Sequence, residues 1–95
     1  MSYKVEIADT ESNNKFLKTL SKEIIPKLAN HLKLLGENPH LGRSVEGPIS
    51  AYIYSFLINH INKVLKFFVT YKVDENTEAI VITDFGKIEI NIIDG

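Results

Sequence analysis

The spacing of apolar residues changes from a helical to a strand period near the middle of the chain. Leu28, Leu32 and Leu35 recur at i, i+4 and i+7, which is the pattern of one buried helix face. From residue 64 to residue 73, most polar residues instead fall on alternate positions, which is the two-residue period of a strand. A chain with helices in one half and strands in the other favours an α+β architecture, with the helices on one face of a small antiparallel sheet.

Three elements are expected before this change of period. Tyr3–Ile7 alternates as a short strand, and Asp9 or Thr10 then provides the N-cap of a first helix. A proline is tolerated only near the start of a helix, so a break between two helices is expected within Ser21–Pro26. Gly36 stands where a left-handed C-cap residue would end the second helix. The stretch ENPHLGRSVEGP, residues 37–48, is expected to be a loop that joins the helices to the sheet.

The second half is expected to be a strand meander. Ala51–Ile58 is apolar on both alternating faces apart from its serine, and Val64–Val73 should turn its odd-numbered residues toward the helices. The sequence NHINK and the segment Asp74–Glu78 are typical of turns. Ala79–Thr83 is expected to return as a strand, and Lys87–Ile93 as either a last short strand or a tail. The predicted order is therefore β-α-α-β-β-β, followed by one more β if the last segment is a strand.

Length and composition restrict the class of protein. Ninety-five residues make one domain, spanning 1–95, with 44% apolar and 24% charged residues. The chain has no cysteine, which excludes disulfides, thiolate nucleophiles and zinc–thiolate sites. No signal-peptide pattern and no membrane-length apolar stretch occurs, so we expect a cytoplasmic protein without a membrane partner. Residues 1–50 are nearly neutral and residues 51–95 are acidic by two charges, so composition supplies no basic stripe for nucleic acid.

Several motifs together resemble one protein family. They are the strand YKVEI, the helix exit LKLLGENPHLGRSVEGP, the tyrosine-bearing strand AYIYSF, and the segments FFVTYKVD and IVITDFGK. In order and spacing they are similar to toxins of the RelE/ParE superfamily, and the resemblance runs from about Tyr3 to Lys87. It implies a toxin of a type II toxin–antitoxin module, of the kind linked to growth inhibition and plasmid stabilisation.

The resemblance also implies partners and mechanism. The RelE-like branch enters the ribosome and cleaves messenger RNA, as an mRNA interferase, whereas the ParE-like branch inhibits DNA gyrase by contact. Both are neutralised by a cognate antitoxin, in an assembly such as a heterotetramer. No cofactor and no metal is implied. A third alternative is a family member that binds its antitoxin without catalytic activity.

Candidate site residues follow from the resemblance and from residue chemistry. Family members carry arginines where this chain has Phe68, Ile88 and Ile90, and they end on a tyrosine that is absent here. The remaining candidates for catalysis are Glu46, His60, Lys66 and Lys87, and those for substrate binding are Arg43, Lys63 and Phe68. Each of these residue types also occurs as an ordinary solvated surface residue, which is the alternative for all of them. Phe68 on an open sheet face is, in addition, typical of a protein contact.

Overall fold

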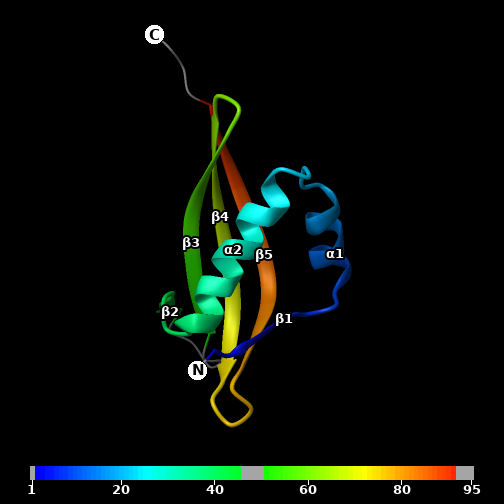
Figure 1. Cartoon of the computed structure of the whole chain (residues 1–95). Coiled ribbons are helices and arrows are strands. Elements are labelled where there is room, and N and C mark those ends of the chain that lie inside the picture. The colour runs from blue at the N-terminus through cyan, green and yellow to red at the C-terminus, as the bar shows by residue number, and fades with distance from the viewer. Residues whose placement is uncertain (1, 46–50, 92–95) are drawn as a thin grey trace.

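The computed structural model describes residues 2–45 and 51–91. In chain order its elements are β1 (Lys4–Ile7), α1 (Glu11–Lys18), α2 (Ile24–Glu37), β2 (Arg43–Val45), β3 (Ala51–His60), β4 (Lys63–Asp74) and β5 (Ala79–Asn91). Both helices lie on one face of a five-stranded sheet, and α2 crosses that face diagonally (Figure 1). The predicted α+β architecture is confirmed. No helix in the described part of the chain combines the length and the apolar character that crossing a membrane requires.

The strand order is β1-β5-β4-β3-β2. Three of the four pairings are antiparallel, but β1 runs parallel to β5, with Lys4 opposite Ala79 and Ile7 opposite Ile82. The sheet is therefore mixed, and the prediction of a wholly antiparallel sheet is wrong at this edge. Parallel neighbours need a long crossover, and the two helices and three strands between β1 and β5 provide it.

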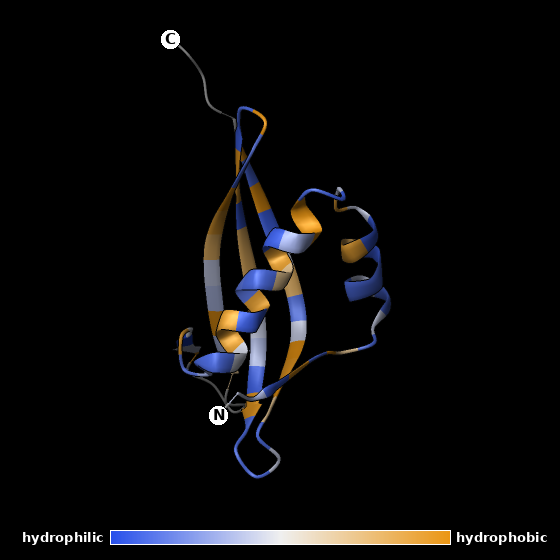
Figure 2. Ribbon diagram, in the orientation of Figure 1, coloured by the Kyte–Doolittle hydropathy of each residue, from blue (hydrophilic) through white to orange (hydrophobic). Residues whose placement is uncertain are grey.

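The core lies between the helices and β3, β4 and β5. Phe67, Val69 and Tyr71 of β4 are fully buried, as the alternation predicted. The ring of Phe67 stacks on Phe56 at 5.5 Å and receives the edge of Phe16 at 6.0 Å. Figure 2 shows apolar and polar residues alternating along these strands. The buried side chains of α2 include the predicted stripe residues Leu28 and Leu35, while Leu32 is partly buried against the core.

Gly36 does not end α2, so its prediction as a left-handed C-cap is wrong. It lies inside the helix, and no glycine in the described ranges has a positive φ. A Cβ at this position would lie 2.9 Å from the Tyr3 carbonyl oxygen and 3.0 Å from the Val5 side chain. The absent side chain lets β1 approach the helix closely enough for Tyr3 N to donate to Gly36 O at 2.8 Å.

Two strands differ from their predicted bounds. The expected loop of residues 37–48 contains β2, which pairs with the start of β3. The two segments expected after residue 78 form one strand, β5, with a one-residue bulge at Thr83, because Tyr71 pairs with Ile82 and Thr70 with Asp84. The bulge reverses the facing of every later residue in β5. Even-numbered residues face the helices before it and face away from them after it.

Candidate functional site

The face of the sheet away from the helices, here called the open face, carries side chains in rows across β3, β4 and β5. The register gives the rows as Ile53–Thr70–Asp84, Ser55–Phe68–Gly86, Leu57–Lys66–Ile88 and Asn59–Val64–Ile90. Lys66 is therefore a single cation between two exposed apolar side chains, because Leu57 is 59% and Ile88 53% exposed. The predicted outward orientation of Lys66 and Phe68 is confirmed.

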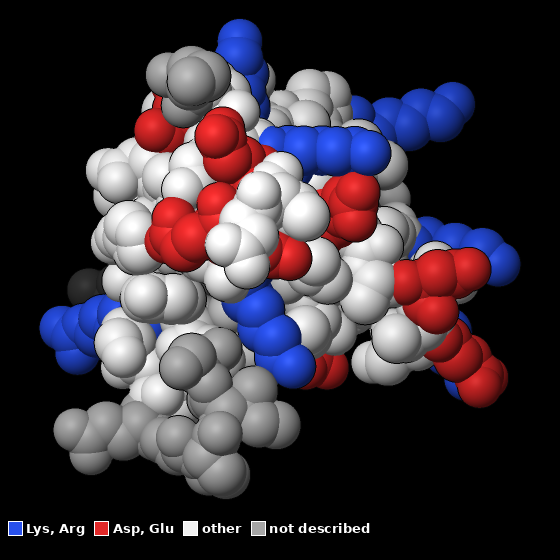
Figure 3. Space-filling view, turned by 90° about the horizontal axis from the view of Figure 1, so that it is seen from below, with Lys and Arg blue, Asp and Glu red and all other residues white. Residues whose placement is uncertain are grey.

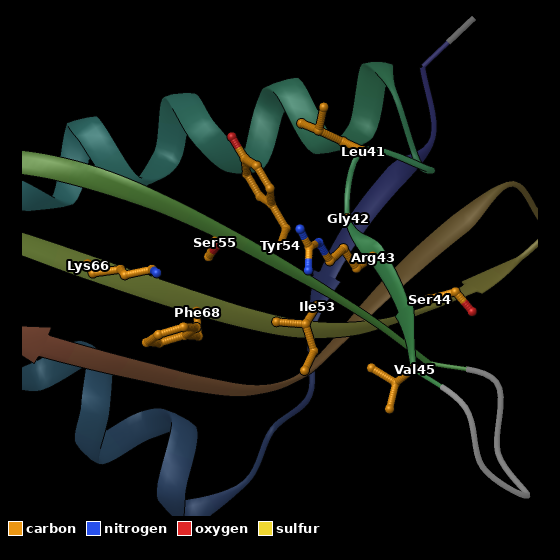
Figure 4. A pocket seen from close by; sticks show the side chains of 10 residues that line it. All are labelled: Leu41, Gly42, Arg43, Ser44, Val45, Ile53, Tyr54, Ser55, Lys66 and Phe68. Atoms are coloured by element: carbon orange, nitrogen blue, oxygen red, sulfur yellow. The ribbon is translucent and has the colours of Figure 1, made fainter.

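One end of the open face is hollowed where β2 joins the sheet. This open-face groove has a volume of about 640 Å³ and is lined by Leu41, Gly42, Arg43, Ser44, Val45, Ile53, Tyr54, Ser55, Lys66 and Phe68. Its lining in the described part of the chain includes two cations and no carboxylate. Figure 4 shows the charged ends of Arg43 and Lys66 directed toward each other from opposite ends of the groove. Lys66 Nζ lies 5.4 Å from the centroid of the Phe68 ring, within cation–π range.

Arg43 is positioned by a hydrogen-bonded tyrosine in the core. The Tyr71 hydroxyl accepts from Gly42 N at 2.9 Å and donates to Pro39 O at 2.8 Å, which ties the segment before β2 to the last third of β4. Burial raises the pKa of Tyr71, so the hydroxyl remains a neutral donor. Sequence reasoning placed this tyrosine on the buried face but did not assign it a partner. The sequence did contain a sign of this contact: a tyrosine lies within an otherwise apolar buried stripe, and a buried hydroxyl needs a hydrogen-bond partner.

The structure divides the predicted site residues into two groups. Arg43, Lys66 and Phe68 line the same groove. His60, Lys63 and Lys87 belong to the opposite, helix-bearing side, because Lys87 pairs with the buried Phe67 and His60 pairs with Lys63. The seventh candidate, Glu46, lies outside the described residues, although it directly follows the groove residue Val45 in the chain.

Two of the helix-bearing candidates lie close to carboxylates of neighbouring residues. His60 Nε2 lies 3.7 Å from a carboxylate oxygen of Glu23, just before α2. Lys63 Nζ lies 2.7 Å from Glu89 Oε1, and this contact lowers the pKa of Glu89. His60 was expected in a turn, but it ends β3, and the turn itself consists of Ile61 and Asn62, both with positive φ. These residues therefore do not converge with Lys66 on one reacting group.

A second groove runs between α2 and the unpaired part of β3. Because β2 pairs only with residues 51–53, the edge of β3 from residue 54 onward has no neighbouring strand among the described residues. This edge groove has a volume of about 320 Å³ and is lined by Lys27, Asn30, His31, Leu34, Leu57, Ile58 and Asn59. Lys27 Nζ donates to Asn59 O at 3.1 Å, which covers one carbonyl of the edge.

His31 joins the edge groove to the aromatic core. Its ring stacks on Phe56 at 3.9 Å, and its Nδ1 lies 3.0 Å from the Tyr54 hydroxyl. Burial lowers the pKa of His31 and raises that of Tyr54, so both groups favour their neutral forms. Sequence reasoning gave His31 no role. The helical spacing that buries Leu28, Leu32 and Leu35 also turns His31 toward the sheet.

No metal centre forms among residues 2–45 and 51–91. No three His, Asp or Glu side chains there are arranged to hold a metal ion. Figure 3 views the end that carries the β4–β5 turn and shows acidic and basic side chains interspersed, with several acidic groups gathered together. That turn contains Asp74, Glu75 and Glu78.

Comparisons with known proteins show the fold. No protein-family model matches the chain, and no curated protein matches it in sequence. Among solved structures, the chain is similar to the free state of an E. coli toxin RelE variant in which two arginines are replaced by alanine. The TM-score is 0.66 at 16% sequence identity, over 90% of this chain and 83% of the other. The chain therefore has the RelE fold, as the sequence resemblance implied.

Proposed function

We propose that this chain is the toxin component of a type II toxin–antitoxin system, acting in the cytoplasm and blocking translation by cleavage of messenger RNA. The RelE fold over nine-tenths of the chain supports the toxin assignment. The observation that carries the choice of RNA is the open-face groove, in which Arg43 and Lys66 are directed toward each other beside Phe68. Two cations, with no carboxylate among the described residues that line the groove, suit a phosphate backbone, and a partly exposed ring suits a base.

Each groove residue has a proposed role in this reaction. Cleavage through the 2′-hydroxyl of RNA needs a base, an acid and positive charge near the phosphate. Arg43 stabilises the phosphate charge, the Lys66 ammonium donates a proton to the leaving oxygen, and Phe68 stacks on a base. Glu46 is proposed as the base on its sequence position alone. His60, Lys63 and Lys87 take no part, because they belong to the other side of the sheet.

The test is pulse labelling after induced expression in a bacterial host without the antitoxin. Incorporation of methionine should collapse before that of thymidine, because the ribosome is the first target. Arg43→Ala and Lys66→Ala should each slow the collapse, since losing one preorganised charge-stabilising group costs about 10²–10³ in rate. Lys72→Ala is the matched control, because Lys72 is a lysine of the same strand that lies outside the groove. Unchanged methionine incorporation with the unmodified chain would contradict the proposal.

A second candidate function is inhibition of DNA gyrase by protein contact. The observation that favours it is the exposed apolar rim of the groove, formed by Leu41, Val45 and Ile53. Such a rim is typical of protein interaction surfaces. Thymidine incorporation would then fall first, and Ile53→Lys would relieve the inhibition more than Lys66→Ala. Continued incorporation of both precursors at normal growth would indicate a chain that binds its antitoxin without harming the cell.

We further propose that the antitoxin occupies the edge groove between α2 and β3. One of its strands pairs with the unpaired edge of β3, and its apolar side chains pack against Leu34 and Leu57. Leu34→Arg should therefore abolish co-purification with the protein encoded by the neighbouring reading frame. Ile25→Arg is the control, since Ile25 is equally exposed on α2 but does not line the groove. Equal binding of both variants would place the antitoxin elsewhere.

A further inference from the structure

The second half of β5 is an unpaired sheet edge. β1 pairs with β5 only over residues 79–82, and the Asn13 amide then donates to Thr83 O at 3.1 Å. From Asp84 to Asn91 no strand in the described part of the chain lies on that side of β5. A long exposed edge is a template for another strand, and soluble proteins usually pair it or protect it.

The charges along this edge are self-complementary. If a second β5 pairs antiparallel about a two-fold axis at Ile88, Lys87 of each copy lies opposite Glu89 of the other. Opposite charges directly across a strand pair are stabilising, and like charges there are destabilising. Glu89 keeps Oε1 on Lys63 at 2.7 Å in its own chain, which leaves its second carboxylate oxygen for the incoming lysine. With this axis, no charged residue between positions 85 and 91 lies directly opposite a residue of like charge in the second copy.

The apolar residues of the edge fit the same axis. Ile88 is 53% and Ile90 47% exposed on the open face, where the bulge at Thr83 directs them. About this axis Ile88 meets its own copy, and Ile90 lies opposite Gly86. A Cβ at Gly86 would have only Phe68 atoms near it, at 3.9 and 4.0 Å. The glycine therefore leaves room beside Phe68 for the isoleucine of the second copy.

We propose that this chain forms a symmetric dimer by antiparallel pairing of β5 with β5 of a second copy, centred on Ile88. The occupant of this edge is a second copy because the pattern Lys87–Ile88–Glu89 complements itself, as a two-fold interface requires. Pairing extends over residues 85–91 and joins the two sheets into one. Ile88 meets its own copy on the open face, so the axis is perpendicular to the sheet. Both open-face grooves then lie on the same side of the dimer.

Cysteine cross-linking tests the register, because the natural chain has no cysteine. Directly opposite residues on paired strands have Cβ atoms about 4.5–5.5 Å apart. Ile88→Cys should therefore form a disulfide-linked dimer rapidly under mild oxidation. Lys87→Cys should cross-link to Glu89→Cys in a mixture more readily than either does alone. Leu57→Cys is the control, being similarly exposed on the same face but on β3; equal cross-linking by Leu57→Cys and Ile88→Cys would overturn the proposal.

Light scattering measures the oligomeric state in solution and so tests the interface without cross-linking. The unmodified chain should be a dimer, and Ile88→Lys, which sets two lysines against each other on the axis, should be monomeric at the same concentration. Leu57→Lys should remain dimeric. Lys87→Glu and Glu89→Lys should each dimerise poorly alone, whereas their mixture should form a heterodimer, because both cross-strand pairs are then of opposite charge. A chain that is monomeric at every concentration, or a mixture that stays monomeric, would exclude the β5 pairing.

Discussion

Replacing Phe67 by alanine is expected to lower the free energy of unfolding by about 3–5 kcal/mol. Phe67 is fully buried between Phe56, on which it stacks, and the edge of Phe16, so its removal leaves a cavity that neither the sheet nor α1 can fill. A small domain has only about 5–15 kcal/mol in total. The variant is therefore expected to be close to unfolding, and denaturant titration followed by circular dichroism measures the loss.

Two further variants keep this prediction testable if Phe67→Ala does not fold. Phe67→Leu retains part of the volume and should lose measurably less stability. Leu57→Ala removes an exposed apolar side chain from the neighbouring strand and should change the free energy of unfolding by less than about 0.5 kcal/mol. A loss for Phe67→Ala no larger than that of Leu57→Ala would show that the aromatic cluster does not hold α1 to the sheet.

Gly42→Ala is expected to displace β2 and to cost about 1–3 kcal/mol through overpacking. The new Cβ would lie 2.7 Å from the Tyr71 hydroxyl and 2.8 Å from the Ile53 carbonyl oxygen, and neither the buried ring nor the backbone is free to move. Relief of the clash pulls Gly42 N away from Tyr71, and Arg43 moves with it. The variant should therefore also weaken the block on translation, as measured by methionine incorporation at matched protein levels.

Gly86→Ala is the matched control for Gly42→Ala. A Cβ at Gly86 makes only ordinary contacts with Phe68, so the stability of the monomer should change little. Tyr71→Phe separates the hydrogen bonds from the steric effect, because it leaves Gly42 N and Pro39 O without their partner while adding no atom. That loss is expected to be about 1–3 kcal/mol. If Gly42→Ala and Gly86→Ala unfold alike, the tyrosine contact does not position β2.

All elements except β2 were predictable at least in part, because their patterns are local. Thr10 caps α1 by accepting from Asn13 N at 3.1 Å, and the buried residues of β4 follow the alternation of the sequence. The direction of β1 was not predictable, because the sequence of a four-residue strand does not identify the strand with which it pairs. The same holds for Gly36, where a helix-ending glycine and a glycine needed for close packing look identical in sequence.

The candidate site was predictable only in part, for the same reason. Lys66 and Phe68 lie on alternate positions of one strand, so the sequence sets them on one face. Arg43 reaches them only through the pairing of β2 with β3, which is a contact between segments separated along the chain. Lys87 was a catalytic candidate because the resemblance implies a basic residue after Gly86. The bulge at Thr83 places it on the helix-bearing side.

The sequence by itself therefore determined the two helices, the strands β1, β3 and β4 and the buried face of β4, since these depend on the period of the apolar residues. Only the tertiary structure decided which cations share a groove and which isoleucines are exposed at the edge. The physical reason is that side chains of a strand alternate between the two faces of the sheet. The extra residue at Thr83 therefore moves every following side chain of β5 to the opposite face, and the local sequence of residues 84–91 does not show that this bulge is present.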